Sequence, residues 1–362
     1  MLELMVMLYK TILYFIWDSF EYILFLLIAI LLLFNRKKIA YYIFLIVLVC
    51  FGGFRGGLGN DFVNYYKWYY IKINDKFFEI GYVGIMNLFA YLNLSIYHIQ
   101  FVFFTGTLIF ISLAIRKFTI NYKFASLYYL VFPYFFLYSF ILMRQYIAMA
   151  IVFWSFQFLL KNKPFQYIIA ILIGSLFHYT CLLAGFLVYF IFFLSKIISK
   201  KQIIFFLLLS IPFAFINWFH FFGFLFEGTK YELYFLEKNM IQVNYIKLIL
   251  FNIEALFIFY FYNELINFNP NNKFFIFLTL FAFILANIFA SVNYLVRFSL
   301  YFRFFEIIIL ADITHFNRKR IYVVLLITLY GLSYFFNVLL SDYKSTGIHT
   351  KLVPYQNILF KK

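Results

Sequence analysis

"SFEYILFLLIAILLLFNRKKIAYYIFLIVLVCFGGF", residues 19–54, consists of two apolar runs, 19–34 and 39–54, around the basic turn "NRKK". A helix needs ~20 apolar residues to cross ~30 Å of hydrocarbon, and somewhat fewer when its ends lie deep in the bilayer. Loops rich in lysine and arginine stay in the cytoplasm. The stretch therefore predicts a pair of membrane-spanning helices whose connecting turn faces the cytoplasm.

The same pattern recurs along the chain. The further apolar runs are 97–115, 124–142, 145–160, 164–177, 180–195, 203–222, 241–262, 274–290, 296–312 and 321–340. Apolar residues make up 66% of the chain and charged residues only 12%, and the mean hydropathy is +0.93. No polar region is long enough for a soluble domain. Residues 1–362 are thus predicted to form a single all-α, polytopic transmembrane domain with about 12 spanning helices.

The net charge of +16 raises the question of a nucleic-acid partner. The basic residues, however, form short clusters between apolar runs. These are "NRKK" at 35–38, "KNK" at 161–163, "KIISKK" at 196–201 and "NRKR" at 317–320. Such spacing is typical of cytoplasmic loops. We therefore expect contacts with membrane lipids and no nucleic acid.

Placing these clusters in the cytoplasm requires that residues 77–96 do not cross the membrane. That segment contains Glu79, two glycines and two asparagines, which makes it a poor span. It is predicted to form a re-entrant or interfacial helix within an outer loop at 55–96. The remaining outer segments are a short loop at 227–239 and a C-terminal tail at 341–362, and both termini lie outside.

The first outer loop opens with "CFGGFRGGLGNDFVNYYKWYY", residues 50–70. Five of the 14 glycines of the chain lie between Gly52 and Gly59. Glycine lets backbone N–H groups approach an anion closely, so this stretch suits anion binding. It is also compatible with a flexible turn in which Arg55 and Asp61 simply pair to hold the loop.

In this topology Arg55, Arg144 and Arg297 fall near the outer leaflet, where arginine is disfavoured. A charge at the bilayer centre costs ~2.5–3.5 kcal/mol on insertion scales. The nearby acids are Asp61, Glu79 and Glu306. Since guanidinium groups suit bidentate phosphate contacts, this set of arginines predicts a phosphate or pyrophosphate ligand. Arg144, however, could also extend to lipid head groups from a helix end.

Three other polar positions accompany these arginines. His178 lies at the tip of the hairpin 164–195, whose two helices rise only ~24 Å each, so it should lie below the outer surface. A lone histidine is more often structural than catalytic, and both interpretations stay open. Gln145 lies beside Arg144 in a similarly deep turn, and Arg303 with Glu306 has the spacing of a buried helix pair.

Several of these residues occur in a recognisable order. Arg55, Gly59, Asp61 and Tyr65 follow an R-x3-G-x-D-x3-Y pattern, and "FEIGY" at 78–82 contains Glu79. Later motifs are "MRQYIAMAI" at 143–151, "SLFHYT" at 175–180, "VRFSLYF" at 296–302, which contains Tyr301, and "VPYQNILF" at 353–360. The series resembles the EpsG family of Wzy-type polysaccharide polymerases over nearly the whole chain. Asn60 departs from the small hydroxyl residue expected there.

The resemblance implies a GT-C-like fold and a polymerase in the bacterial cytoplasmic membrane, with its active site facing the periplasm or exterior. Such enzymes transfer a growing glycan from undecaprenyl pyrophosphate to an incoming lipid-linked oligosaccharide, making O-antigen, capsule or exopolysaccharide. A chain-length regulator is a further partner that the resemblance allows.

The expected chemistry assigns roles to the residues. Arg144, Arg297 and Arg55 would stabilise the pyrophosphate leaving group. His178 is the first candidate for the general base and Asp61 the second. The supporting residues are Gln145, Tyr65, Glu79, Arg303 and Tyr301. Because no DxD, metal-ligand spacing or P-loop occurs, we expect neither a metal nor another cofactor.

Alternative functions share parts of this pattern. An O-antigen ligase carries out the same chemistry but usually has a large late outer loop, and a glycosyltransferase using polyprenyl-phosphate sugars usually shows acidic pairs in its first outer loop. A lipid-linked oligosaccharide flippase or transporter is the alternative from another class. It predicts inverted repeats and helices broken at the bilayer midplane.

Overall fold

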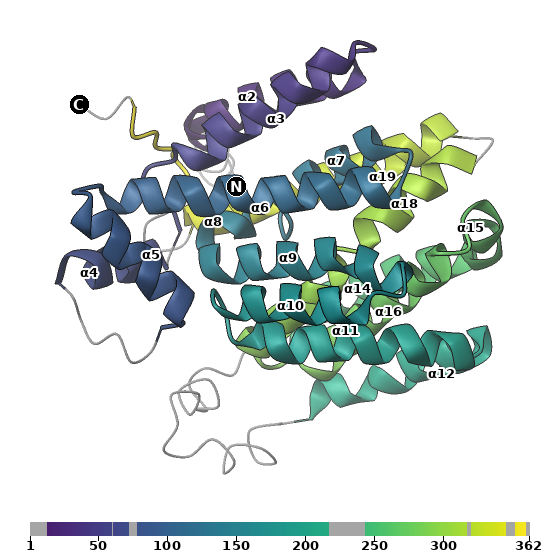
Figure 1. Cartoon of the computed structure of the whole chain (residues 1–362). Helices are drawn as coiled ribbons and strands as arrows, with labels where there is room; N and C mark the ends of the chain where they lie inside the picture. The colour runs from purple at the N-terminus through teal and green to yellow at the C-terminus, as the bar shows by residue number, and fades with distance from the viewer. Residues whose placement is uncertain are drawn as a thin grey trace.

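The computed structural model describes residues 13–59, 61–71, 78–216, 243–316, 320–344 and 352–359. Within these ranges the named elements are all helices, which confirms the all-α prediction (Figure 1). The helices of the first half are α2 (Phe20–Phe34), α3 (Lys38–Gly53), α4 (Phe62–Ile71), α5 (Ile80–Tyr91), α6 (Ile96–Phe118), α7 (Tyr122–Val131), α8 (Tyr138–Ile141) and α9 (Met143–Leu160).

The second half continues in the same way. Its elements are α10 (Pro164–Ser175), α11 (Thr180–Ile197), α12 (Lys200–Ser210), the short 3-10 helix η2 (Pro212–Phe215), α14 (Tyr245–Tyr260), α15 (Tyr262–Phe268), α16 (Asn272–Ile288), α17 (Asn293–Arg303), α18 (Glu306–Phe316) and α19 (Arg320–Lys344). The predicted outer loop at 227–239 lies outside the described residues.

Four of the described helices are long and apolar enough to cross a membrane: Ile96–Phe118, Met143–Leu160, Thr180–Ile197 and Ile321–Lys344 within α19. The pair α14 and α15, bent by 52°, makes a fifth if it forms one span. Others, such as α2 and α3, are apolar but shorter. These helices fit a membrane protein, whereas the total of about 12 spans is not confirmed and stays a prediction.

Helix α9 forms the centre of the bundle. Of its most apolar 18-residue window, 72% is buried, compared with 28% for α19 and 39% for α11. The peripheral helices expose large apolar side chains, such as Leu183 and Phe186 on α11 and Leu329 on α19. Apolar surface of this kind on peripheral helices is what contact with lipid requires.

Among the predicted continuous spans that are in fact divided, two have breaks that bear on the polar residues. The run 124–142 separates into α7 and α8, and Pro133 lies in the break because it lacks the N–H that a continuing helix needs. The run 296–312 separates into α17 and α18 at Phe304 and Phe305. There the chain turns so that Arg303 Nε, just before the break, donates to Glu306 Oε2 at 2.8 Å, just after it.

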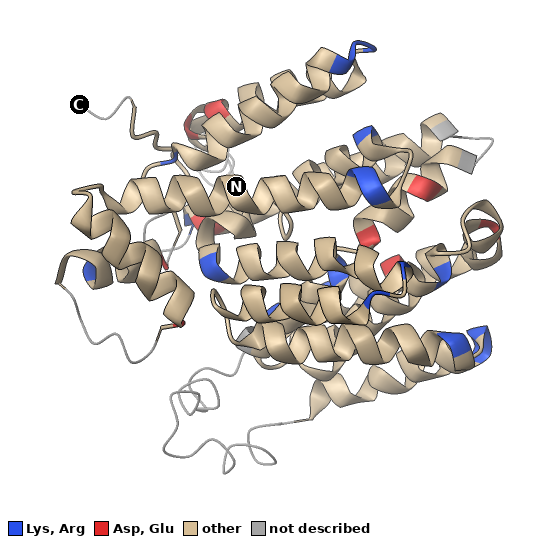
Figure 2. Ribbon diagram, viewed as in Figure 1, with Lys and Arg blue, Asp and Glu red and all other residues tan. Residues whose placement is uncertain are grey.

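The basic loops gather at one end of the bundle (Figure 2). Lys123 Nζ donates to the backbone oxygen of Asn35, which joins two of these loops. Lys200 Nζ lies 4.9 Å from the ring centre of Phe259 and 5.0 Å from that of Tyr262, which joins the "KIISKK" loop to the bend between α14 and α15. This clustering is what the predicted cytoplasmic loops require.

Helices α4 and α5 lie at the opposite end (Figure 1). Helix α5 has 12 residues and so rises only about 18 Å, too little to span the hydrocarbon. Its start packs closely on the hairpin tip. The Gly81 N–H donates to the Leu176 oxygen at 2.9 Å, and a Cβ at Gly81 would lie 2.8 Å from that oxygen. The interfacial placement of α5 stays a prediction.

The C-terminal segment 352–359 returns to the glycine-rich stretch. The Gly56 N–H donates to the Gln356 oxygen at 2.6 Å, and the Ile358 N–H donates to the Phe54 oxygen at 2.9 Å. Tyr22 Oη, on α2, donates to the Leu352 oxygen at 2.9 Å. The tail thus fastens the start of the first outer loop to the helices beneath it.

Candidate functional site

The end of the bundle opposite the basic loops brings together residues from five distant parts of the chain. They come from the glycine-rich loop, the start of α5, the start of α9, the hairpin tip before α11, and α17. Each region contributes at least one of the residues singled out by the sequence. Their mutual contacts define two groups and a cavity.

Arg144, in the first turn of α9, forms the first group. Its Nη1 makes an ion pair with Glu79 Oε2, and the two side chains are 16% and 5% exposed. Its guanidinium carbon lies 4.8 Å from the ring centre of Phe78, 5.2 Å from that of Tyr82 and 5.7 Å from that of Tyr65. Two predicted supporting residues, Glu79 and Tyr65, therefore contact Arg144 directly.

Asp61 lies beside this group, immediately before α4. Burial raises the pKa of its carboxyl group, whereas the positive charges of Arg297 and Arg144 act to lower that pKa. Gly59, two residues earlier, adopts φ +93°, and a Cβ there would lie 3.2 Å from the Ile141 Cα. Glycine at this position lets the loop pack against α8.

The second group is a chain of hydroxyl groups leading from His178. The Thr180 hydroxyl lies 2.7 Å from His178 Nδ1 and 3.0 Å from Tyr301 Oη. His178 and Tyr301 were predicted from separate motifs, whereas Thr180, which joins them, was missed as a site residue. Its only sequence signal is its place in "SLFHYT".

Arg297 lines a cavity of about 190 Å³ next to these groups. Gln145 Nε2 donates to the Arg297 backbone oxygen at 3.5 Å, so α9 and α17 meet here. The cavity wall consists of Tyr134, Tyr138, Ile141, Leu142, Lys247, Phe251, Val296, Arg297, Ser299, Leu300, Arg303 and Tyr334. Of the arginines predicted to bind pyrophosphate, Arg297 is the one in this lining.

Arg55 lies behind the α8 wall and is 1% exposed. Its guanidinium donates to the backbone oxygens of Gly52 and, at 3.3 Å, Phe140, and its carbon lies 4.7 Å from the Phe140 ring centre. Burial lowers the pKa of Arg55 to about 9, so it remains cationic near neutral pH. The ion pairs among the described residues do not join Arg55 to Asp61. Backbone carbonyl oxygens hold the Arg55 guanidinium instead.

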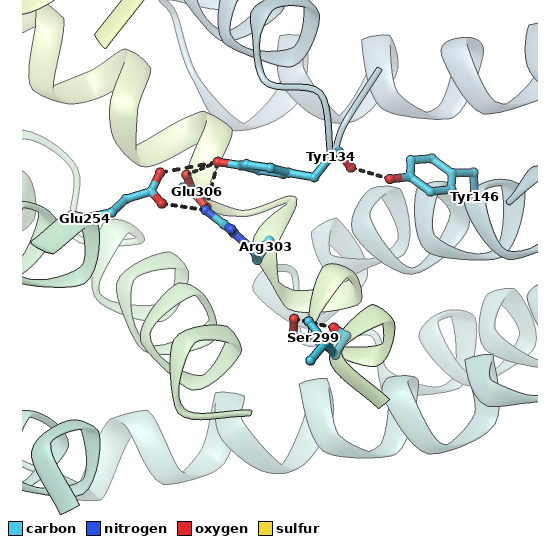
Figure 3. Close-up of polar contacts among 7 residues, drawn as sticks. Tyr134, Tyr146, Glu254, Ser299, Arg303 and Glu306 are labelled. Atoms are coloured by element: carbon cyan, nitrogen blue, oxygen red, sulfur yellow. Dashed lines mark hydrogen bonds and ion pairs between the residues drawn. The ribbon is translucent and has the colours of Figure 1, made fainter. Parts of the chain in front are cut away.

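Arg303 occupies a buried ionic cluster at the break between α17 and α18 (Figure 3). The predicted pair with Glu306 is confirmed at 2.8 Å, and a second ion pair joins Arg303 Nη2 to Glu254 Oε2 at 2.7 Å. Tyr134 Oη accepts from Arg303 at 2.8 Å and lies 3.0 Å from Glu306 and 3.3 Å from Glu254. Sequence analysis assigns Glu254 no role, with Lys247 as its possible partner, and does not single out Tyr134; the structure pairs Glu254 with Arg303.

Two further observations bear on the chemistry of the site. Among the described residues, no three His, Cys, Asp or Glu side chains form a group that could hold a metal ion. His98 has a local structural role, because its Nδ1 accepts from the Ser95 N–H at 3.1 Å at the start of α6.

Comparison with known proteins gives one match. The profile of the EpsG family matches residues 38–357, which is most of the chain. No curated protein and no solved structure matches, so the GT-C-like arrangement stays a prediction.

Proposed function

Because the chain belongs to the EpsG family of Wzy-type polysaccharide polymerases, we propose that it polymerises undecaprenyl-pyrophosphate-linked oligosaccharide units at the outer face of the bacterial cytoplasmic membrane. The growing glycan passes from its lipid carrier to the non-reducing end of an incoming lipid-linked unit, and undecaprenyl pyrophosphate is released. O-antigen, capsule and exopolysaccharide are the product classes.

One observation supports this proposal most directly. Residues far apart in sequence come together: Asp61 lies near Arg144 and Arg297, and His178 is joined through Thr180 to Tyr301. The Tyr179 N–H, next to His178, donates to Glu79, the partner of Arg144, and Glu79 precedes α5 at the end of the bundle opposite the basic loops. With the basic loops in the cytoplasm, that end faces the exterior. A polymerase that uses exported lipid-linked units needs its polar groups on that side.

In the proposed reaction, the acceptor hydroxyl oxygen attacks the anomeric carbon of the sugar attached to pyrophosphate. The bond from that carbon to the pyrophosphate oxygen breaks, and its electron pair leaves with the pyrophosphate. Arg297 and Arg144 stabilise the growing negative charge. Arg55 would have to leave the carbonyl groups of Gly52 and Phe140 to reach the same anion.

His178 is the proposed base for the hydroxyl proton. With Nδ1–H donating to Thr180, Nε2 is the atom that accepts the proton. Thr180 then donates to Tyr301 Oη, which fixes the ring orientation. Asp61 is the alternative base, because burial favours its uptake of a proton.

The test is glycan profiling of a deletion strain complemented with variants. The wild-type gene restores a ladder of long chains, whereas Arg297→Ala and Arg144→Ala leave single-unit products only. The exposed Arg116→Ala serves as a control and restores the ladder. Full ladders from both site variants, at normal protein levels, would refute the assigned roles.

We also propose that the reaction needs no metal ion. Purified enzyme given a lipid-linked unit should keep its activity in excess EDTA. Loss of activity that Mg²⁺ or Mn²⁺ restores would instead support a metal-dependent glycosyltransferase.

One observation favours the flippase alternative enough to test it. Two helices are broken beside a buried ionic cluster, and Glu306 lies about 15 Å along α18 from the basic end, half of a ~30 Å hydrocarbon layer. A flippase mutant would retain lipid-linked units inside the cell. A polymerase mutant still exports single units, so their appearance on the cell surface excludes the flippase.

A further inference from the structure

The cavity beside Arg297 has an unusual balance of charge. Three cationic residues line it, Lys247, Arg297 and Arg303, together with three tyrosines and Ser299, and the lining residues that the structure describes include no Asp or Glu. A single water needs only about 10–15 Å³, so the cavity of about 190 Å³ has room for a much larger polar group. Its lining suits an anion.

Lys247 lines this cavity from α14, a helix that contains none of the sequence motifs. Its Nζ lies 5.4 Å from the ring centre of Phe251, and the guanidinium carbon of Arg303 lies 4.7 Å from the same ring centre. The ion pairs among the described residues do not involve Lys247. Two like charges therefore share one aromatic ring, and a bound anion would relieve their repulsion.

The charge of Arg303 is already matched by Glu254 and Glu306, which hold its guanidinium in place. Lys247, which forms no ion pair among the described residues, is thus the cation with most to gain from a ligand. Arg297 and Arg303 are six residues apart on α17, about 9 Å along the helix axis. Cations spread over this length match two linked phosphate groups better than one.

The surface next to the cavity is apolar. Helix α14 exposes Ile246, Ile249 and Ile253, at 72%, 58% and 56%. A polar cavity beside an apolar, lipid-facing helix fits a molecule with a charged head and a hydrocarbon tail.

We propose that this cavity binds the diphosphate group of a polyprenyl carrier and that Lys247 is one of its ligands. The inference rests on the proposed function, since it concerns the leaving group of that reaction. It adds a residue that lies outside every motif of the sequence and a cavity wall formed by α14.

The test measures binding separately from catalysis. Purified protein in phosphatidylcholine nanodiscs is titrated with farnesyl diphosphate, farnesyl monophosphate and inorganic pyrophosphate. Lys247→Met should weaken farnesyl diphosphate binding about 10-fold or more, the scale of one lost charge-assisted contact, whereas Lys247→Arg should preserve most of it.

The matched control is Lys196→Met. Lys196 also lies over an aromatic ring, 4.4 Å from the Phe192 ring centre, but at the basic end of α11. This variant should bind farnesyl diphosphate as the wild type does. Thermal unfolding of each variant shows whether it is folded. If Lys247→Met does not fold, Lys247→Arg still tests whether the charge at this position supports binding.

The outcomes separate this inference from the proposed function. Wild-type protein that does not bind farnesyl diphosphate, or a folded Lys247→Met variant that binds it normally, overturns the inference even if polymer is made. Lys247-dependent binding without polymerisation overturns the function and supports the cavity assignment. If phosphatidylglycerol in the nanodiscs displaces farnesyl diphosphate from the protein, the cavity binds phospholipid head groups, and the inference is overturned.

Discussion

Three arginines in apolar surroundings are stabilised in three different ways. Arg144 has one carboxylate and three aromatic rings, Arg303 has two carboxylates and a tyrosine hydroxyl, and Arg55 has backbone oxygens and aromatic rings. Arg297 lines a cavity. Residue type alone therefore does not assign a role, because a guanidinium can be satisfied by several kinds of partner.

Thr180 is predicted to be a positioning residue for His178. Removing its hydroxyl in Thr180→Val should lower kcat about 10-fold and shift the pH profile of the reaction, because the His178 tautomer is no longer held. Thr180→Ser should keep both near wild type. The measurement is the rate of polymer formation against pH.

The outcome for His178 itself provides the comparison. His178→Ala should abolish extension, leaving single units. If Thr180→Val changes KM alone, or leaves the pH profile unmoved, the hydroxyl chain has only a structural role.

Asp61 should make stability depend on pH. Burial raises its folded-state pKa, so the carboxyl group destabilises the fold once pH exceeds its unfolded value of about 3.9. This penalty is absent at lower pH. Asp61→Asn should therefore raise the unfolding temperature at pH 7 and lose this advantage near pH 3. An equal gain at both values would mean that ionisation is not the cause.

At the scale of elements, the breaks in two helices allow the ionic cluster to form. An unbroken helix through 296–312 would satisfy its own backbone but could not turn at Phe304 and Phe305. The loop at Tyr134 similarly brings its phenol ring to within 3.9 Å of the Arg303 guanidinium carbon. Both breaks therefore meet at one set of side chains, which links the loop between α7 and α8 to α14, α17 and α18.

Arg303 should be required for this packing. Arg303→Met leaves two carboxylates without their cation and should destabilise the protein by about 3–5 kcal/mol. The triple variant Arg303→Met, Glu254→Gln, Glu306→Gln should recover much of that loss. Denaturant unfolding in detergent measures both.

The exposed Arg116→Met is the control for a lost arginine and should change stability little. If the single Arg303→Met variant is as stable as wild type, the cluster does not hold the broken helices together.

At the scale of the whole molecule, the two ends of the bundle differ in charge and in the residues that they carry. The basic loops lie at one end and the candidate residues at the other, which predicts opposite exposure to the medium. Tyr91 lies at the candidate end and is 84% exposed, and Lys163 is exposed in the "KNK" turn.

Thiol labelling of intact cells checks this orientation. The background is Cys50→Ser, because Cys50 is exposed whereas Cys181 is buried. Tyr91→Cys should react with a membrane-impermeant reagent, and Lys163→Cys should react only after permeabilisation. The reverse result would invert the topology and place the candidate site in the cytoplasm.

Some features of the protein follow from sequence alone, because they depend on local properties. Composition and apolar run length predicted a helical membrane protein, and helices form most of the described part of the predicted runs. The i, i+3 spacing predicted the pair of Arg303 and Glu306. Ordered motifs predicted the family that the profile matches.

The tertiary structure decided which side chains meet. Arg144 and Glu79 are 65 residues apart, and Thr180 and Tyr301 are 121 apart. Glu254, which pairs with Arg303 across 49 residues, and Lys247, which lines the cavity, belong to no motif. Such contacts depend on how helices break, bend and pack against each other. Hydropathy and residue spacing describe one helix at a time, so they carry no information about those angles.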